Sequence, residues 1–322
     1  MTSLNKKWKV LVCDPISEKA INLLLEKGLN VKFYNRNKER LDDIISEFDI
    51  IIVRSATKVT KSIIDKAVNL KIIARAGAGL DNIDVKYATT KGIRILNSPI
   101  SVANAVAELT IGLIFALLRR IPQAYMSMKE KKWRKKEFLG YELEGKTLGI
   151  IGLGNIGSRV AIKAKGLGLH VIGYKRTKLS YYAKKLGIDA AETLDYVLRK
   201  SDIITLHVPL TPDTYHMIDA SKIDLMKDGA YLINTSRGGV IDGRALLKAL
   251  DNGKIAGVAL DVWENEPPKY DWEWKLAGHP KVIPTPHIGA MTVEAQNKAG
   301  VYIAEKILRE IDLIETLKTK RD

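Results

Sequence analysis

The feature that most constrains the fold is a glycine-spaced turn near the middle of the chain. An apolar run at 146–151, KTLGII, leads directly into the turn GLGNIG at 152–157, and a helical stretch, SRVAIKAKGLG, follows at 158–168. In a strand–turn–helix unit, glycines at this spacing allow a tight turn, close approach of the backbone to a pyrophosphate, and close packing of helix on strand. The helix N-terminus then faces the anion. The predicted dinucleotide site, for NAD or NADP, contains Gly152, Gly154, Asn155, Ile156 and Gly157.

Short β-branched runs alternate with amphipathic stretches on both sides of a long apolar segment. The first set covers 9–98 and the second begins at 146, and this order is typical of parallel sheets covered by helices. The segment at 102–120 is apolar nearly all round, so we expect a helix buried between two domains or two subunits. A last helical stretch at 291–317 is expected to return over the first domain.

These patterns predict an α/β protein with two doubly wound parallel-sheet domains. A Rossmann cofactor domain at 99–290 is inserted into a flavodoxin-like substrate-binding domain formed by 1–98 and 291–322. The first domain is therefore expected to be discontinuous in sequence.

Composition narrows the class of protein. The chain has 322 residues, 46% of them hydrophobic, and shows neither a signal-peptide core nor an apolar span near 20 residues, so we expect a cytoplasmic protein without membrane contact. The formal charge of +15 is compatible with binding to nucleic acid, to an anionic surface, or to polyanionic small molecules such as phosphorylated acids and dinucleotides. Because no zinc-ligand cluster or RNA-binding aromatic signature accompanies it, we expect no nucleic-acid partner and no bound metal. The single cysteine, Cys13, lies in an apolar run and is expected to be a buried structural thiol.

The glycine pattern is interrupted at the ribose position. The end of the next strand, HVIGY, usually offers Asp or Glu to a ribose hydroxyl, but here Lys175 and Arg176 follow. They could be a solvated surface pair or a cationic site for a 2′-phosphate. Since this strand end faces the ribose in such a fold, the second interpretation is favoured and acceptance of NADP is predicted.

Three polar residues follow three late apolar runs, where open α/β sheets bind their ligands. Arg237 follows AYLIN, Glu266 follows VAL and His287 follows KVI. Hydride transfer at a hydroxyl-bearing carbon needs a base for the hydroxyl proton and a cation for a substrate carboxylate. We predict His287 as acid and base, Glu266 as the carboxylate that raises its pKa, and Arg237 as the anchor. Taken singly, each residue is better explained by a structural or surface role.

The motifs together resemble the D-isomer-specific 2-hydroxyacid dehydrogenases. The glycine turn, LHVPLTPDTYHMI, LINTSRGGVID, ALDVWENEPP and TPHIGAMTVEAQ occur in family order over nearly the whole chain. The resemblance implies that Arg237, Glu266 and His287 are catalytic and that Asp261 contacts the nicotinamide amide. It also implies a cofactor lining of Ala78, His207, Val208, Thr235, Ser236, Gly289 and Ala290.

Within that family, four stretches resemble the D-3-phosphoglycerate dehydrogenases of serine biosynthesis: VRSATKVT, ARAGAGLDNID, RRIPQAYMSMKEKKWRKKEF and GYELEGKTLGIIGLG. This implies a homodimer in which a basic residue of WRKKEF, Arg134 or Lys135, reaches the neighbouring subunit's substrate. The residues implied to hold the substrate's carboxylate and phosphate are Arg54, Ser55, Arg75, Ala76 and Gly77. One departure is Val102, where the family often has asparagine; Asn104 stands two positions later. No regulatory extension is expected beyond Asp322.

Three other functions stay open. An NADPH-dependent glyoxylate or hydroxypyruvate reductase is favoured by Lys175 and Arg176, whereas RSATKVT and WRKKEF favour a phosphorylated substrate. A dinucleotide-sensing binding protein similar to a transcriptional corepressor would keep the fold without turnover. Nucleic-acid binding would show a steep dependence on salt.

Overall fold

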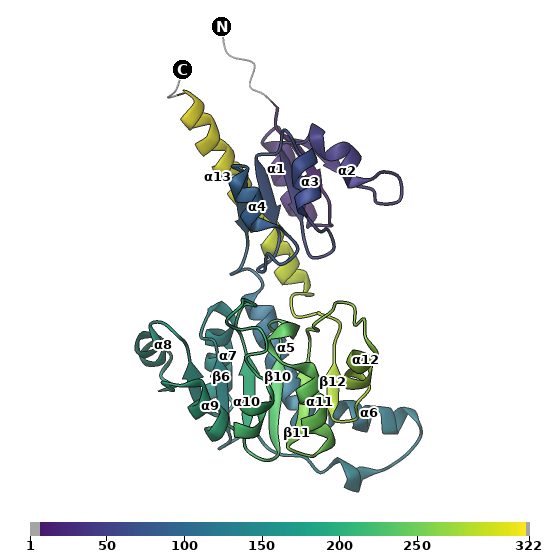
Figure 1. The fold of residues 1–322 in the computed structure, drawn as a ribbon, viewed down its shortest axis with the longest axis vertical. Coiled ribbons are helices and arrows are strands. Elements are labelled where there is room, and N and C mark those ends of the chain that lie inside the picture. The colour runs from purple at the N-terminus through teal and green to yellow at the C-terminus, as the bar shows by residue number, and fades with distance from the viewer. Residues whose placement is uncertain (1–6, 320–322) are drawn as a thin grey trace. The chain divides into compact units, whose positions relative to one another are not determined.

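The structure, a computed structural model, describes residues 7–319 (Figure 1). The chain forms two compact units. Unit 1 contains the residues up to Val102 and those from Ala290 onward, and unit 2 is Ala103–Gly289. Each unit is a parallel sheet covered by helices on both faces, which confirms the predicted fold class.

Unit 1 has a five-stranded parallel sheet in the order β2-β1-β3-β4-β5. This is the flavodoxin-like order, whose direction of winding reverses between β1 and β3. The strands are β1 (Lys9–Val12), β2 (Asn30–Phe33), β3 (Ile50–Val53), β4 (Ile72–Arg75) and β5 (Arg94–Asn97). The helices are α1 (Glu18–Glu26), α2 (Leu41–Ile44), α3 (Lys61–Lys66), α4 (Val85–Thr90) and α13 (Val293–Thr319), with the 3-10 turn η1 (Ile45–Glu47).

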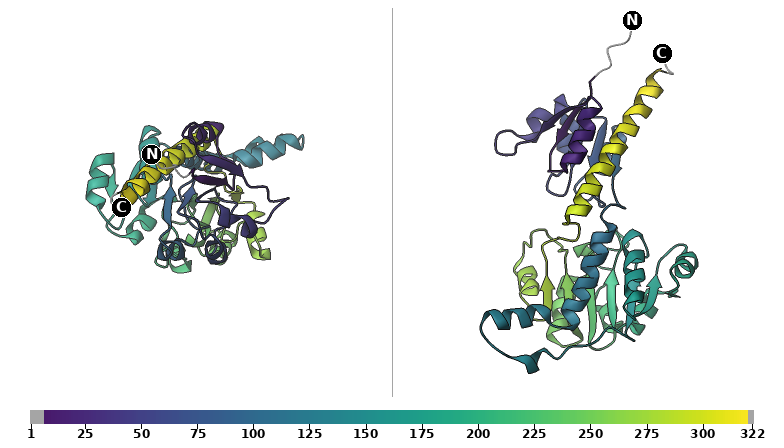
Figure 2. Two further views of the ribbon diagram at one scale, coloured as in Figure 1. Left: turned by 90° about the horizontal axis from the view of Figure 1, so that it is seen from above. Right: turned by 180° about the vertical axis from the view of Figure 1, so that it is seen from behind.

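Alternate residues of the buried strands of unit 1 pack on opposite faces. Ile50 and Ile52 lie in the core formed with α1 and α13, whereas Ile51 and Val53 lie in the core formed with α2, α3 and α4. Helix α13 packs along α1 and also contacts β4 and β5 (Figure 2). The expected return of the last helix over the first domain is therefore confirmed.

Unit 2 has a seven-stranded parallel sheet in the order β12-β11-β10-β9-β6-β7-β8. Counted from β6 this is the Rossmann order with one further strand, and winding reverses between β6 and β9. The strands are β6 (Thr147–Ile151), β7 (His170–Tyr174), β8 (Asp189–Ala190), β9 (Ile203–Leu206), β10 (Ala230–Asn234), β11 (Ile255–Leu260) and β12 (Val282–Pro284). The helices are α5 (Ala103–Leu118), α6 (Ile121–Lys129), α7 (Asn155–Gly166), α8 (Leu179–Leu186), α9 (Leu194–Lys200), α10 (Ala220–Leu225), α11 (Gly243–Asp251) and α12 (Asp271–Ala277), with η2 (Lys135–Phe138) and η3 (Gly238–Val240).

The apolar helix α5 belongs to unit 2. It packs against α7 and against strands β10, β11 and β12, which accounts for its buried side chains Ala107, Ile114 and Leu118. Burial against its own sheet therefore explains much of the all-round apolar pattern. Within residues 7–319, no helix combines the length and apolarity needed to cross a membrane.

Candidate active site

The glycine turn connects β6 to α7 at the point where the winding of unit 2 reverses. Gly152 has a φ of +101°, and a Cβ there would lie 2.3 Å from the carbonyl oxygen of His207. A Cβ on Gly157 would lie 2.0 Å from the carbonyl oxygen of Gly152. The close packing of the chain therefore requires the first and third glycines.

Gly154 differs from these two glycines because a Cβ there would meet no atom within 4 Å. It is the N-cap of α7, and no side chain caps the helix there. Open space beside an uncapped helix N-terminus suits close approach of a phosphate to backbone N–H groups. The residues present thus fit a bound dinucleotide.

His207 follows β9 on the other side of the reversal point. Its Nε2 lies 3.0 Å from Thr205 Oγ1, and its Nδ1 is buried without a hydrogen-bond partner among the described residues. Burial lowers the pKa of His207 to about 3. This imidazole is therefore neutral near pH 7, so it can donate or accept hydrogen bonds but cannot act as a cationic acid.

Lys175 and Arg176 follow β7, and the strand's last residue, Tyr174, accepts a 2.9 Å hydrogen bond from the Gly152 amide through its carbonyl. Lys175 Nζ lies 4.7 Å from the centre of the Tyr182 ring. Arg176 Nη1 lies 2.9 Å from Asp213 Oδ2 in an exposed ion pair. The sequence analysis missed Asp213 because it lies 37 residues from Arg176 and no local motif connects them. Its charge offsets one of the two cations.

The structure brings the predicted pair His287 and Glu266 into contact. His287 Nδ1 lies 2.6 Å from Glu266 Oε2, and about two fifths of each side chain is exposed, 41% and 39%. Glu266 Oε1 accepts a second hydrogen bond from the Trp263 amide at 3.2 Å. The imidazole is thereby oriented by Nδ1, which leaves Nε2 as the nitrogen for exchange with a substrate.

The environment of this pair favours the charged form of both groups. The hydrogen bond that His287 donates to Glu266 raises the pKa of His287, against a lowering effect of burial. Burial alone would raise the pKa of Glu266, but the hydrogen bond and charge of His287, the Trp263 amide and the charge of Arg237 together lower it. Arg237 therefore lies close enough to act on both groups, and the three residues form one cluster.

Buried Asp261 fixes the loop that carries His287. Its Oδ1 accepts hydrogen bonds from Thr285 Oγ1 at 2.6 Å and the Ile288 amide at 2.8 Å, and its Oδ2 accepts one from the Gly289 amide at 2.8 Å. The His287 amide donates to the Asp261 carbonyl at 2.8 Å, and His287 has a left-handed φ of +53°. These contacts hold His287 in a backbone conformation that non-glycine residues rarely adopt. Contact of Asp261 with nicotinamide stays a prediction.

Two residues that the sequence analysis missed hold the neighbouring loops. Trp263 donates through Nε1 to the Thr285 carbonyl at 3.1 Å, which links the Glu266 loop to the His287 loop. Asn234 accepts at Oδ1 from the Ser236 amide and hydroxyl and donates through Nδ2 to the Arg237 carbonyl at 2.9 Å. An asparagine at a strand end before a turn is a recognisable local signal, whereas Trp263 carries none.

Glycine also allows the Arg237 and Glu266 loops to touch. A Cβ on Gly238 would lie 1.9 Å from the carbonyl carbon of Trp263, so these backbones are in direct contact. Of the predicted cofactor lining, Thr235 Oγ1 lies 2.9 Å from Thr110 Oγ1 in the buried interior, and Val208 follows His207 after β9. Gly289 is held by Asp261, and Ala290 is the first residue of the second segment of unit 1.

The predicted substrate residues of unit 1 lie at one edge of its sheet. Arg54 and Ser55 follow β3, and Arg75 ends β4, the strand paired with it. The Ala76 amide donates to the Val53 carbonyl at 2.9 Å, and the Gly77 carbonyl accepts from the Ser98 amide. The carbonyl of Ala78, predicted to line the cofactor, accepts from Asn97 Nδ2 at 2.8 Å.

Arg134 and Lys135 lie in unit 2 but at the opposite end of its sheet from the catalytic cluster. Helix α6, which precedes them, lies beside β12 (Figure 1). Its Gln123 Nε2 donates to the carbonyl of Pro280, just before β12 begins, at 3.1 Å. Arg134 pairs with Glu137 at 3.3 Å and donates from Nε to Ser127 Oγ. Within this one chain, the structure therefore does not bring them to His287.

Comparison with known proteins identifies the family. Residues 111–289 match the family model of the D-isomer specific 2-hydroxyacid dehydrogenase NAD binding domain, and this stretch lies wholly inside unit 2. The chain belongs to the D-isomer specific 2-hydroxyacid dehydrogenase family. The family predicted from the motifs is thereby confirmed, and with it the oxidoreductase class.

Curated relatives with different names are similarly close. A D-3-phosphoglycerate dehydrogenase of Methanocaldococcus jannaschii is 48% identical over 299 residues, which are 93% of this chain and 56% of the relative. The chain thus spans little more than half the length of that relative. A hydroxypyruvate reductase of Thermotoga maritima is 47% identical over 308 residues, which are 95% of this chain and 99% of the relative.

Solved structures agree with the fold. A D-lactate dehydrogenase from Aquifex aeolicus, complexed with NAD and lactic acid, matches with a TM-score of 0.84 at 32% identity and covers 97% of this chain and 98% of its own. A glyoxylate reductase from Paecilomyes thermophila matches with a TM-score of 0.83 at 32% identity and covers 94% of each chain.

The pairing of His287 with Glu266 predicts a measurable titration. In Glu266→Gln the charge that raises the His287 pKa is lost while the lowering effect of burial remains, so the pKa of His287 should fall. NMR titration of the ring protons measures this directly. His170, whose Nε2 lies 3.0 Å from Asp189 instead, is the internal reference, because the substitution removes none of its contacts. An unmoved His287 would contradict the proposed electrostatic coupling.

Proposed function

We propose that the chain transfers a hydride between NAD(P) and C2 of a small 2-hydroxy or 2-keto acid. The observation that carries this proposal is the 2.6 Å contact of His287 with Glu266 beside Arg237, on loops that follow β10, β11 and β12. Unit 2 is assigned the cofactor and unit 1 the substrate. A bound NAD(P) would supply or accept the hydride through its nicotinamide ring.

The chain's own residues manage the charge and the proton. Arg237 holds the substrate carboxylate and polarises the C2 oxygen. In the reductive direction, protonated His287 donates its Nε2 proton to that oxygen, and in the oxidative direction the neutral ring accepts the proton back. Glu266 stabilises the imidazolium and holds the ring. The turn at 152–157 and the N-terminus of α7 hold the pyrophosphate.

The proposed substrate is D-3-phosphoglycerate, with 3-phosphohydroxypyruvate as the keto form, in serine biosynthesis. The 48% identical phosphoglycerate dehydrogenase supports it, as do Arg54 and Arg75 at one sheet edge of unit 1. The alternative is an NADPH-dependent glyoxylate or hydroxypyruvate reductase, favoured by the reductase relative of nearly equal length and by the cations after β7. A dinucleotide-sensing corepressor-like role would need no coupled His287 and Glu266.

A cytoplasmic homodimer completes the proposal. Large apolar side chains are exposed along 121–141, among them Trp133 at 80% and Leu139 at 83%. The occupant of this surface is a second copy of the chain, because Arg134 and Lys135 lie in the same stretch, away from their own catalytic cluster. The other exposed apolar members are Ile121, Tyr125, Met126, Met128 and Tyr141.

Steady-state kinetics test the function directly. The wild type is assayed with 3-phosphoglycerate, D-lactate, glyoxylate and hydroxypyruvate, each with both cofactors, and 3-phosphoglycerate should give the highest kcat/KM. His287→Ala should lower turnover by about 10² to 10⁴-fold, since it removes the acid and base, while cofactor affinity stays nearly unchanged. No turnover of any member would favour the binding-protein alternative, and undiminished turnover in His287→Ala would remove that residue from the mechanism.

Cofactor preference is predicted from the charges after β7. No acidic side chain is present there to repel a 2′-phosphate, so the wild type should accept NADP(H) at least as well as NAD(H). We expect kcat/KM to be about fivefold or more higher with NADP(H) at low salt, and this advantage should shrink as salt rises. Lys175→Asp should reverse the preference, and Asp213→Asn should strengthen it by releasing Arg176. Lys248→Asp on α11 is the charge-matched control. Strong selection for NAD by the wild type would show that Lys175 and Arg176 are a solvated surface pair that does not contact the cofactor.

The basic segment after α6 predicts selectivity for phosphorylated acids. Arg134→Ala with Lys135→Ala should raise KM for 3-phosphoglycerate about tenfold or more and leave D-lactate and glyoxylate nearly unchanged, because a lost phosphate contact affects only phosphorylated substrates. Lys184→Ala with Lys185→Ala on α8 is the matched control. Equal losses for both substrate classes would contradict the phosphate role, and a fully active monomer would contradict the cross-subunit role.

A further inference from the structure

The loop that carries Arg54 begins where the winding of unit 1 reverses. It follows β3, and Asp14 follows the neighbouring strand β1 just beyond Cys13. At such a reversal the loops after the two strands diverge and leave a crevice at the carboxyl ends, which is where open α/β sheets bind ligands. The arrangement of residues 54–57 therefore determines which side chains are presented beyond the carboxyl ends of these two strands.

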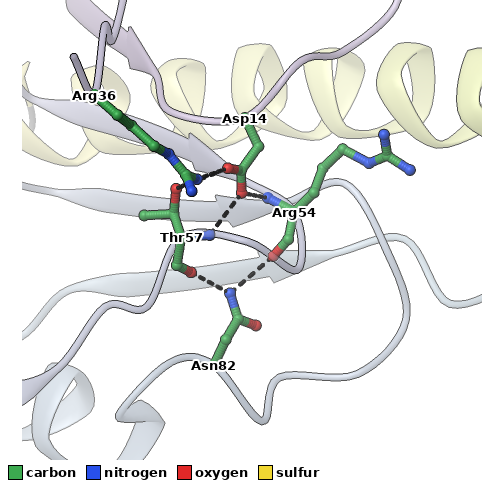
Figure 3. A network of polar contacts seen from close by, with 5 residues as sticks. All are labelled: Asp14, Arg36, Arg54, Thr57 and Asn82. Atoms are coloured by element: carbon green, nitrogen blue, oxygen red, sulfur yellow. Dashed lines mark hydrogen bonds and ion pairs between the residues drawn. The ribbon is translucent and has the colours of Figure 1, made fainter. Parts of the chain in front are cut away.

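The Asp14 carboxylate holds this loop by accepting hydrogen bonds from the loop's backbone N–H groups. Its Oδ2 accepts from the Arg54 amide at 2.6 Å and from the Thr57 amide at 3.1 Å. Its Oδ1 accepts from Thr57 Oγ1 at 2.8 Å and from Arg36 Nη2 (Figure 3). Arg36 Nη2 also donates to Thr57 Oγ1 at 2.7 Å, which closes the network.

On the other side of the same loop, Asn82 donates hydrogen bonds to the loop's backbone carbonyls. Its Nδ2 donates to the Arg54 carbonyl at 2.8 Å and to the Thr57 carbonyl at 2.6 Å. In both Arg54 and Thr57, the backbone amide is thus bonded to Asp14 and the backbone carbonyl to Asn82 (Figure 3).

The centre of the network, Asp14 and Thr57, is buried, whereas the side chains that the loop carries are not. Asp14 is only 3% exposed, and a buried carboxylate is costly unless hydrogen bonds and an opposite charge satisfy it, as they do here. The Arg54 guanidinium points away from the network and has a 3.9 Å contact with Met291 Sδ (Figure 3). Ser55 and Ala56, between the two held residues, are exposed. A rigid backbone therefore carries a cationic and a hydroxyl side chain at its open edge.

We propose that Asp14 and Asn82 are positioning residues for substrate binding, which hold residues 54–57 so that Arg54 and Ser55 meet an anionic group of the 2-hydroxy acid. This inference rests on the proposed function, in which Arg54 and Ser55 contact that acid. Misplacement of a binding group by about 1 Å can cost about a hundredfold in kcat/KM. Substrate binding therefore depends on the position in which the loop holds Arg54 as well as on the charge of Arg54.

Steady-state kinetics of Asp14→Asn test the proposal. The substitution keeps the shape but replaces one carboxylate oxygen with a donor that faces N–H groups, so KM for the acid should rise about tenfold or more. The kcat should stay within about twofold because Arg237, Glu266 and His287 are untouched. Affinity for NADH or NADPH, measured by fluorescence titration, should not change. Asn82→Ala leaves Asp14 in place and should shift KM in the same direction, which keeps the test valid if Asp14→Asn folds poorly.

Two controls separate positioning from general loss of stability. Asp49 is another buried aspartate of this sheet, 2% exposed, but it accepts from the Lys9 amide at the opposite, amino ends of the strands. Asp49→Asn should therefore destabilise unit 1 without raising KM. In an Arg54→Ala background, Asp14→Asn should raise KM by a smaller factor than in the wild type, because the part of its effect that passes through Arg54 is already lost.

The outcomes distinguish this inference from the function beneath it. Three results would overturn the positioning role: an unchanged KM in Asp14→Asn, the same rise in KM in Asp49→Asn, or an undiminished rise in the Arg54→Ala background. In each case an active wild type would still support the proposed dehydrogenase function. A wild type that turns over no member of the substrate panel would contradict the proposed function, and the positioning role would fall with it.

Discussion

Where a parallel strand stops, the backbone groups beyond it lose their ladder partners, and the residues that end up there need other acceptors and donors. In both units a buried polar side chain supplies them. Asp14 accepts from the amides of Arg54 and Thr57, Asp261 accepts from those of Ile288 and Gly289, and Asn234 serves the turn before Arg237. The loops that carry the candidate functional residues are rigid for this reason, and the positions of those residues depend on it.

The two carboxylates near His287 illustrate how environment separates roles. Asp261 is buried and bonded on both oxygens to the loop it holds, so its charge serves backbone geometry. Glu266 is partly exposed and shares one oxygen with His287, so its charge raises the pKa of the imidazole. The charge of Asp261 also raises the pKa of His287, but less than the hydrogen bond to Glu266 does. A substitution at Asp261 should therefore act mainly on where the His287 backbone lies, and one at Glu266 mainly on when the ring holds a proton.

Much of the fold follows from the sequence because it depends on local patterns. The β-branched runs, the amphipathic stretches and the glycine turn at 152–157 each determine their own element, and parallel strands then bring Arg237, Glu266 and His287 to one edge. Contacts between distant loops are different. The pairing of Asp213 with Arg176 and the link from Trp263 to Thr285 depend on how two loops settle against each other. No periodicity or turn preference encodes such contacts, which is why the sequence analysis missed them.

The proposed division between residues for proton transfer and residues for substrate recognition would account for relatives of one fold with different names. The residues proposed for proton transfer lie within 237–287 of unit 2, whereas those proposed for the substrate's anionic groups lie in unit 1 and on the segment after α6. A change in Arg54, Ser55 or Arg134 would alter the acceptable acid without touching the His287 and Glu266 contact. Lactate, glyoxylate and hydroxypyruvate enzymes can therefore share this scaffold. In the proposed function, substrate identity therefore depends on the loop at 54–57 and the segment after α6 more than on the catalytic cluster.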